Sequence, residues 1–485
     1  MMKKITLVLA AAGVLACSSY AFADTSSDNA TLQQEIKTLQ KQLAALETKV
    51  NTSSSSSQPQ SQPQASIASS TAGSETPAKP FTVSVANYTG VEPRYDGFNL
   101  IVNNPGVNND VALLKLRQAE IEYYEQIGQD YKGDPKLIFS GEVEGTSVYT
   151  TPYTGTSAGT NFNLTDAELD TFVEGNRWVS GYMTFGYNSG SDGEANEVNN
   201  SEVQLGQGYL TIGDFTTAPV YGSFGQMYVP FGRYSSYMIS TPSAKTLGRI
   251  QTRAINLGYH SNDAEFTPFA AVYGFEGANE INGNPASNSD VESYGSNLGL
   301  SFSKDDYSGM LGVSYTSNIA ESSGLQGDGS ANSGFASSQG TEALTKRVPG
   351  ADIYGQIGYN DYLLLAEFVK ATTQFNANNL SYNGQGAQPE ALDVEAVYSF
   401  EFWHPSYVGV AYGESWQALS LGVPKKNFGA VYSIAIWQNT ALSFELMHNI
   451  GYSENDTSYM DGISMDQNSQ GESYNTASLR FDLFF

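Results

Sequence analysis

The chain has 485 residues and a formal net charge of −27, yet only 15% of its residues are charged, against roughly 25% in ordinary soluble domains. The acidic balance argues against nucleic acid as a partner, because phosphate binding requires clustered basic residues. Beyond the N-terminus, no stretch is long and apolar enough to form a membrane-spanning helix.

Residues 1–23 resemble an export signal. Lys3 and Lys4 precede the short apolar run "ITLVLAAAGVLA", and Ala21-Phe22-Ala23 supplies small residues for cleavage. Cleavage there would leave a chain without cysteine, and therefore without disulfides. The sequence "VLAC" loosely resembles a lipoprotein cleavage site, so whether Cys17 is lipidated stays open.

Residues 29–50 predict a short periplasmic coiled coil. The apolar residues recur at alternating spacings of four and three, as in Leu32, Ile36, Leu39, Leu43, Leu46 and Val50. Such a narrow stripe is marginal in water unless copies bundle together, so we expect a homo-oligomer, either a dimer or a trimer. A single helix lying on another surface is the alternative. Residues 51–80 are a Ser/Gln/Pro-rich linker.

The segment 81–135 is mixed in pattern. It contains the helical stretch "ALLKLRQAEIEYYEQIG", which ends before the breaker "KGDP" at 132–135. We expect this helix to lie at the mouth or inside of the structure that follows.

From residue 136 onward the pattern is that of strands. In "ALDVEAVYSFEF" (391–402) apolar residues alternate with Asp393, Glu395, Ser399 and Glu401. Sixteen such segments are predicted to start near 136, 167, 178, 202, 220, 251, 266, 294, 307, 351, 362, 391, 405, 425, 440 and 473.

The connections between these strands are alternately short and long, which is typical of an up-and-down transmembrane β-barrel with two different rims. An all-β barrel of about sixteen antiparallel strands is therefore predicted for 136–485, with both chain ends on the periplasmic, short-turn side. Its apolar face turns to lipid, so Asp393, Glu395 and Glu401 are expected to form an acidic wall of the lumen. A soluble β-sandwich or propeller shares the alternation but explains neither the two rims nor the last strand.

The final residues, "NTASLRFDLFF", alternate in the same way. Phe481, Leu483 and the terminal Phe485 resemble the assembly signal of bacterial outer-membrane barrels. The expected partners are outer-membrane lipid, lipopolysaccharide and the barrel-assembly machinery.

The block 225–253, "GQMYVPFGRYSSYMISTPSAKTLGRIQTR", concentrates basic residues at the loop between the fifth and sixth strands. Arg233, Lys245, Arg249 and Arg253 lie there, in a chain with only 23 basic residues. A loop that folds into a pore lumen and carries positive charge would form a constriction and a binding shelf for anions. Alternatively, the four residues pair with nearby carboxylates or lipid phosphates at the rim. Arg253 fits the lumen least, because its parity matches the outward Ile255 and Leu257.

The sequence contains no complete motif for catalysis or metal binding. His260, His404 and His448 are far apart and show no metal-ligand spacing, and "YGESWQ" lacks the second glycine of a nucleophile elbow. His448 beside Asn449 could suggest an outer-membrane lipase dyad, although a histidine at the rim explains it more simply. We expect no enzyme activity, metal or cofactor.

The motifs "YVPFGRYSSYMIS" (228–240) and "YDGFNLIVNNPGVNNDVALLKLRQ" (95–118), with the coiled coil, resemble the LbtU-type siderophore porins. The resemblance implies an outer-membrane barrel with a periplasmic coiled-coil extension that takes up an iron-carrying siderophore. The residues after the linker are too few for a TonB-gated barrel with a folded plug, so uptake would be passive. A general or anion-preferring porin without a siderophore role and an envelope tether acting through the coiled coil are alternatives; a hydrolase comes last.

Overall fold

The computed structural model describes residues 106–485 with short gaps at 132, 134, 154–155, 190–200, 263–264, 279–280, 282–289, 305, 328–333, 336–343, 438 and 466. It also describes the backbone of β1 (Thr82–Val85), β2 (Arg94–Asp96) and β3 (Asn99–Ile101). The predicted signal peptide with Cys17, the coiled coil and the linker lie outside the described residues.

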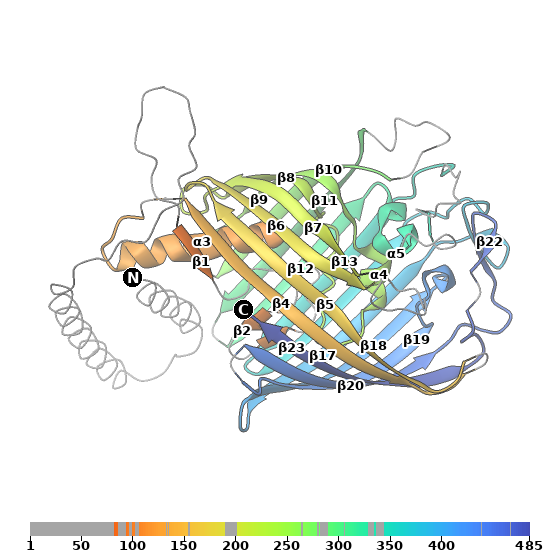
Figure 1. Cartoon of the computed structure of the whole chain (residues 1–485). Coiled ribbons are helices and arrows are strands. Elements are labelled where there is room, and N and C mark those ends of the chain that lie inside the picture. The colour runs from red at the N-terminus through yellow and green to blue at the C-terminus, as the bar shows by residue number, and fades with distance from the viewer. Residues whose placement is uncertain are drawn as a thin grey trace, which may run out of the picture. The chain divides into compact units, whose positions relative to one another are not determined.

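Sixteen long strands follow one another around a single sheet (Figure 1). They are β4 (Lys136–Thr150), β5 (Gly159–Glu174), β6 (Val179–Ser189), β7 (Ser201–Gly213), β8 (Val220–Tyr228), β9 (Gln251–His260), β10 (Phe266–Glu276), β11 (Val291–Lys304), β12 (Tyr307–Thr316), β13 (Gly350–Tyr359), β14 (Tyr362–Ala371), β17 (Glu390–Glu401), β18 (Pro405–Trp416), β19 (Lys426–Ile434), β20 (Thr440–Ile450) and β23 (Ser473–Phe484).

The sheet closes on itself. The last strand, β23, pairs antiparallel with the first, β4, from Thr476↔Thr150 to Phe484↔Glu142. Every other neighbouring pair in the ring is also antiparallel, so the predicted sixteen-stranded up-and-down barrel is confirmed. All strand starts lie within three residues of the predicted ones except the second, which begins at Gly159 rather than near 167. The backbone of β1 pairs in parallel with the first residues of β4.

The outer face of the barrel is apolar around its middle. Leu257, Leu298, Leu311 and Val410, from four different strands, are each more than half exposed. Aromatic pairs lie toward the two rims, with Tyr307–Tyr359 and Tyr362–Tyr398 centroids 4.7 Å apart near the short turns and Tyr412–Phe428 5.1 Å apart toward the long loops. An apolar belt between aromatic girdles is the surface that a membrane-spanning barrel presents to lipid.

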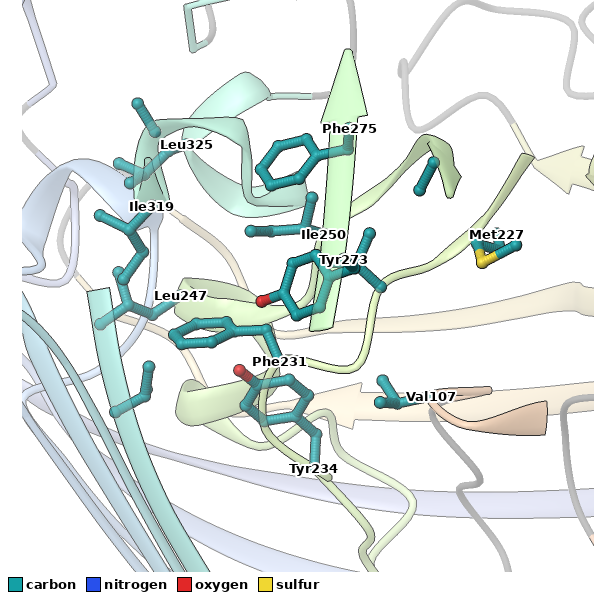
Figure 2. Packing of buried hydrophobic residues seen from close by; sticks show 14 of the residues in the cluster. Val107, Met227, Phe231, Tyr234, Leu247, Ile250, Tyr273, Phe275, Ile319 and Leu325 are labelled. Carbon is teal, nitrogen blue, oxygen red and sulfur yellow. The ribbon is translucent and has the colours of Figure 1, made fainter. Parts of the chain in front are cut away.

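The loop between β8 and β9, residues 229–250, forms the interior core instead of projecting from the rim. It carries α4 (Ser243–Gly248) and buries Val229, Phe231, Tyr234, Leu247 and Ile250. Figure 2 shows Phe231, Tyr234, Leu247 and Ile250 near Tyr273 and Phe275 of β10. Ile319 and Leu325 of the same cluster belong to η3 (Ile319–Glu321) and α5 (Ser323–Gln326). Burial of this apolar surface holds the loop inside the barrel.

A helix, α3 (Asn109–Gln126), attaches to the inner wall near the short turns. Leu114 packs with Phe215 and Tyr221, and the Arg117 guanidinium donates a hydrogen bond to the Gly213 carbonyl. Deeper in the lumen, Asn256 Nδ2 donates to Asp110 Oδ2 at 3.1 Å. Burial raises the pKa of the Asp110 carboxyl.

Lys136, the first residue of β4, forms an ion pair with Glu120 of the same helix. Polar contacts to α3 therefore occur both within the lumen and at its edge.

Short strands lie at the end of the barrel that carries the long loops. They are β15 (Leu380–Tyr382), β16 (Gln385–Gly386), β21 (Ser458–Met460) and β22 (Ile463–Ser464), which form a separate four-stranded sheet. The turn η4 (Leu419–Leu421) lies beside β21. Among the helices of the described residues, none combines the length and the apolarity needed to cross a bilayer.

The outward orientation of β11 gives a testable consequence. Leu298→Arg places a charge on the apolar belt and should lower the free energy of unfolding in lipid vesicles by about 2–4 kcal/mol, because the charge meets hydrocarbon. His404→Arg, in the exposed turn after β17, is the matched control and should have little effect. Urea titration of the reconstituted protein measures both; equal stability of the two variants would contradict the assignment of faces.

Candidate functional site: the narrowed lumen

Carboxylates of the barrel wall hold the inserted loop through its backbone. Glu367 of β14 accepts hydrogen bonds from the N–H groups of Arg233 and Tyr234, at 2.6 and 2.5 Å. Tyr234 has a positive φ of 57°, a conformation that brings two consecutive N–H groups to one carboxylate. The loop thus turns at the point where the wall supplies a negative charge.

The next strand, β17, repeats this arrangement. Glu395 accepts from the Ser236 hydroxyl at 2.5 Å and from the Tyr237 N–H at 2.8 Å. Asp393, on the same face, accepts from the Ala244 N–H at 2.7 Å.

A third group of contacts lies on β20, three strands further around the barrel from β17. Glu445 is fully buried and accepts from the N–H groups of Ile239 and Ser240 at 2.7 and 3.0 Å, and also from the Ser240 hydroxyl. Buried backbone donors need acceptors, and a carboxylate is a strong one. The four carboxylates therefore fix the loop across the bore as a constriction.

A cavity of about 460 Å³ remains between this loop and the opposite wall. It lies among the tip of the loop and strands β4, β5, β19, β20 and β23. Its polar lining comprises Glu144, Thr146, Thr165, Asp166, Ser240, Thr241, Lys245, Asn427, Asn449, Tyr474, Thr476, Ser478 and Arg480.

Arg480 of β23 is the central cation of the wall beside this cavity. It is 3% exposed, and its guanidinium lies 3.0 Å from Glu144 Oε2 and 3.0 Å from Asp482 Oδ1. Glu144 lies directly opposite Asp166 in the β4–β5 ladder, and Glu142 lies opposite Glu168. Like charges in such positions repel each other, so Arg480 stabilises an otherwise unfavourable acidic surface.

A second hollow of about 670 Å³ lies toward the long loops and shares Asp166 with the cavity. Gln226 and Gln251, on its other side, donate side-chain hydrogen bonds to backbone carbonyls at Leu205 and Gly206. Arg253 and Glu276 line this second hollow as well.

The four basic residues predicted for the constriction lie in different surroundings. Only Lys245, in α4, lines the cavity. The backbone at Arg233 is bound to Glu367, and the Arg249 guanidinium lies 4.6 Å from the centroid of the Tyr228 ring, a cation–π contact.

Arg253 does not line the cavity and lies beside the second hollow instead. It is on the outward face of β9, its side chain is 75% exposed, and it lies 3.9 Å from Glu276. Since side chains alternate along a strand, the parity that aligns it with Ile255 and Leu257 explains this placement.

The three residues predicted for the acidic wall do not all point into the lumen. Asp393 and Glu395 point inward and bind the loop, whereas Glu401 is exposed at the short-turn end of β17. Phe481 and Leu483 lie on the outer face, and Phe485 exchanges two backbone hydrogen bonds with Gly141 of β4.

The histidines do not converge. His260 lies between the rings of Phe215 and Phe269, His404 is in the turn after β17, and His448 shares a hydrogen bond with Asn475. Within the described part of the chain, no group of three potential ligands is placed to hold a metal ion.

Comparison with known proteins places the chain in a family. A UPF0422 protein of Coxiella burnetii (strain RSA 493 / Nine Mile phase I) is 34% identical over 413 residues, covering 83% of this chain and 84% of that protein. A UPF0422 protein of Legionella pneumophila (strain Lens) is 33% identical over 410 residues, covering 82% and 76%. The chain belongs to the UPF0422 family. No family profile matches it.

Among solved structures, this UPF0422 protein is similar to the anion-selective porin from Comamonas acidovorans, with 12% identity and a TM-score of 0.47 over 72% of this chain and 100% of that one. It is also similar to the outer membrane channel DcaP of Acinetobacter baumannii, with 14% identity and a TM-score of 0.43 over 73% and 99%. The names of the UPF0422 relatives state no substrate, so the LbtU-type resemblance stays a prediction.

The carboxylates that hold the loop can be tested one at a time. Glu395→Ala removes the acceptor of two buried donors and should lower the free energy of unfolding by about 1–3 kcal/mol. It should also make single-channel current larger and noisier, because the loop loses an anchor in the lumen. Glu401→Ala, on the same strand but exposed and without a contact to the loop, is the control. Identical current traces for the two variants would show that the carboxylate does not position the loop.

Proposed function

We propose that this UPF0422 protein is a porin of the bacterial outer membrane that lets small polar solutes diffuse passively through its lumen. The observation that carries the proposal is the polar cavity between the inserted loop and the wall of a closed barrel whose outer face is apolar. A passage lined by charged and hydrogen-bonding groups and narrowed by a fixed loop is the arrangement by which pores combine permeability with selectivity.

The charges that line the cavity favour selection by local charge pattern over a simple anion shelf. Lys245 and Arg480 line the cavity, but Glu144 and Asp166 line it as well. Of the basic residues predicted for the constriction, only Lys245 lines the cavity. The carboxylates of Glu144 and Asp166 in the same lining balance its positive charge.

Passive, TonB-independent uptake of a siderophore or another small anionic solute is the second candidate. It is supported by the sequence resemblance to the LbtU-type porins and by the presence of Lys245 and Arg480 at the cavity. Growth of a deletion strain under iron limitation separates this function from that of a general pore, since only a siderophore porin would be needed there.

The N-terminal segments belong to the same proposal. The coiled coil at 29–50 would join copies of the chain in the periplasm, with both termini on that side. Sedimentation of the purified protein with and without residues 29–50 tests the homo-oligomer. If the chain were chiefly an envelope tether, deleting 29–50 would abolish its cellular role while leaving conductance intact.

Obstruction of the cavity tests the pore directly. Thr146→Trp adds a large ring to the cavity lining on β4 and should reduce single-channel conductance in planar bilayers severalfold, because it fills the passage. Ser147→Trp adds the same ring to the adjacent outward position and is expected to leave conductance unchanged. Equal conductance for both variants would mean that ions do not pass the cavity, and a silent wild-type protein would end the porin proposal.

A further inference from the structure

The barrel wall has a notch between β7 and β8 near the long loops. In the part of these strands that the structure describes, the β7–β8 ladder ends at the pair Gly208↔Gln226. Beyond this pair, in the same described segments, residues 201–205 of β7 pair only with β6, and residues 227–228 of β8 pair only with β9. The chain then enters the lumen as the inserted loop, from Val229 onward. The notch therefore lies where the loop leaves the wall.

Two glutamine side chains bridge the notch. Gln226 Nε2 donates hydrogen bonds to the carbonyls of Leu205 and Gly206, at 2.9 and 2.8 Å. Gln251 Nε2 donates to the Gly206 carbonyl at 2.6 Å, so this bond reaches from β9 to β7 past the end of β8. Carbonyls released from a ladder beside lipid need donors, and the two amides supply them. Water can replace such side-chain bonds at little net cost, so the bridge opens more easily than a strand ladder.

The second hollow, of about 670 Å³, lies at this notch and is lined by residues from both faces of the wall. Gln204 of β7 aligns with Gly186 and Glu168 on the two preceding strands, and this face points into the lumen. Gln226 pairs with Arg253 on the outer face. Side chains of opposite faces can line one hollow only where the wall between them is interrupted. The hollow is therefore accessible from both faces at the notch.

The notch lies at the border between a polar and an apolar part of the outer face. Arg253 is followed two residues later on the same face of β9 by Ile255, which pairs with Phe224 of β8. Ile255 and Phe224 are exposed, as is Leu205 on the other side of the notch. The lumen side of the hollow presents amide, hydroxyl and carboxylate groups instead. A polar and an apolar environment thus meet within one small space.

We propose that the notch is a lateral opening of the barrel that binds single-chain amphiphiles with an uncharged, hydroxyl-rich head group, such as alkyl glycosides. The head group lies in the hollow, and the alkyl chain leaves through the notch toward the apolar outer face. The volume of about 670 Å³ lies within the range of small-molecule sites, roughly 300–1,000 Å³. The inference goes beyond the proposed passage of small polar solutes, since it names a second route into the barrel and a second class of ligand.

The lining of the hollow favours hydroxyl groups over charged groups. Its basic side chain, Arg253, lies 3.9 Å from Glu276, so an anionic head group would compete with this carboxylate. A hydroxyl group needs no opposite charge, because it can donate to the carboxylate of Glu168 and accept from the amides of Gln204 and Gln226. Contact of the alkyl chain with the apolar face adds a free energy of binding that the head group alone lacks.

Protection of an introduced cysteine tests the inference on the full-length protein in lipid vesicles. Gln204→Cys lies on the lumen side of the notch, and Asn427→Cys, in the cavity on β19, is the matched control. The measurement is the rate at which a charged, water-soluble thiosulfonate labels each cysteine. Sub-micellar dodecyl maltoside should slow labelling of Gln204→Cys roughly threefold, as expected at a concentration about twice the dissociation constant. Maltose at the same concentration should slow neither variant, because it lacks the chain.

A second substitution tests whether the chain passes the notch. Gln226→Phe fills the notch with a ring and should abolish the protection of Gln204→Cys by dodecyl maltoside. Ile255→Phe adds a ring on the same outer face, beside the intact part of the ladder, and should preserve the protection. If Gln226→Phe does not fold, the comparison of the two cysteines and the two sugars still decides the question.

Several results would overturn the lateral opening. They are the absence of protection at Gln204→Cys, equal protection by maltose, equal protection of Asn427→Cys, and protection that persists in Gln226→Phe. The first would mean that no amphiphile binds, and the others that the ligand is bound by its head group alone or enters through the mouth of the barrel. None of these results depends on conductance, so a silent protein in planar bilayers would end the porin proposal and leave the lateral opening standing.

Discussion

Closure of the sheet is the constraint on which the rest of this structure depends. In a bilayer no water is present to bond an unpaired backbone group, so the pairing of β23 with β4 must complete the ring. Once the ring is closed and its apolar face turns to lipid, every second residue of each strand points into a confined space. That space then has to accommodate charged side chains such as Glu367, Glu395 and Glu445.

The inserted loop meets this requirement and also bounds the cavity. Its backbone N–H groups supply hydrogen bonds to the carboxylates that the loop itself buries, while its apolar side chains pack on β10. The loop crosses from β14 to β20, and the wall of β4, β5 and β23 remains uncovered at the cavity. The narrowing of the lumen and the cavity beside the loop therefore have one structural cause.

The fold could be predicted almost entirely from the sequence, because alternation with a period of two survives in every long strand. The sequence predicts the start of the second strand too late because its first residues, "GTNFNLTD", are mostly polar and lead into the register shift at Glu144/Gly145 of its partner. The sequence does not predict the strands β15, β16, β21 and β22, because segments of two or three residues are too short to show a periodic pattern.

The candidate site was predictable only in outline. The inward loop and the inward face of Asp393 and Glu395 follow from pattern, but their binding partners are backbone N–H groups, which leave no mark in a sequence. Arg480 is recognisable in the sequence as the lone basic residue on the polar face of "LRFDLFF". Its partner Glu144, however, lies far away in the chain. The fold of the loop decides which of its basic residues line the cavity. Lys245 reaches the cavity, whereas Arg249 stacks on Tyr228.

The most direct measurement uses adjacent residues of β19 with opposite orientations. Cys17, within the predicted export signal, is the only cysteine, so single cysteines can be introduced at Asn427, which lines the cavity, and at Phe428, on the apolar outer face. A water-soluble thiol reagent added during single-channel recording should lower the current of Asn427→Cys in steps and leave Phe428→Cys unchanged. Loss of current in Phe428→Cys with none in Asn427→Cys would contradict the account, because the polar side of the barrel would then not line the path of the ions.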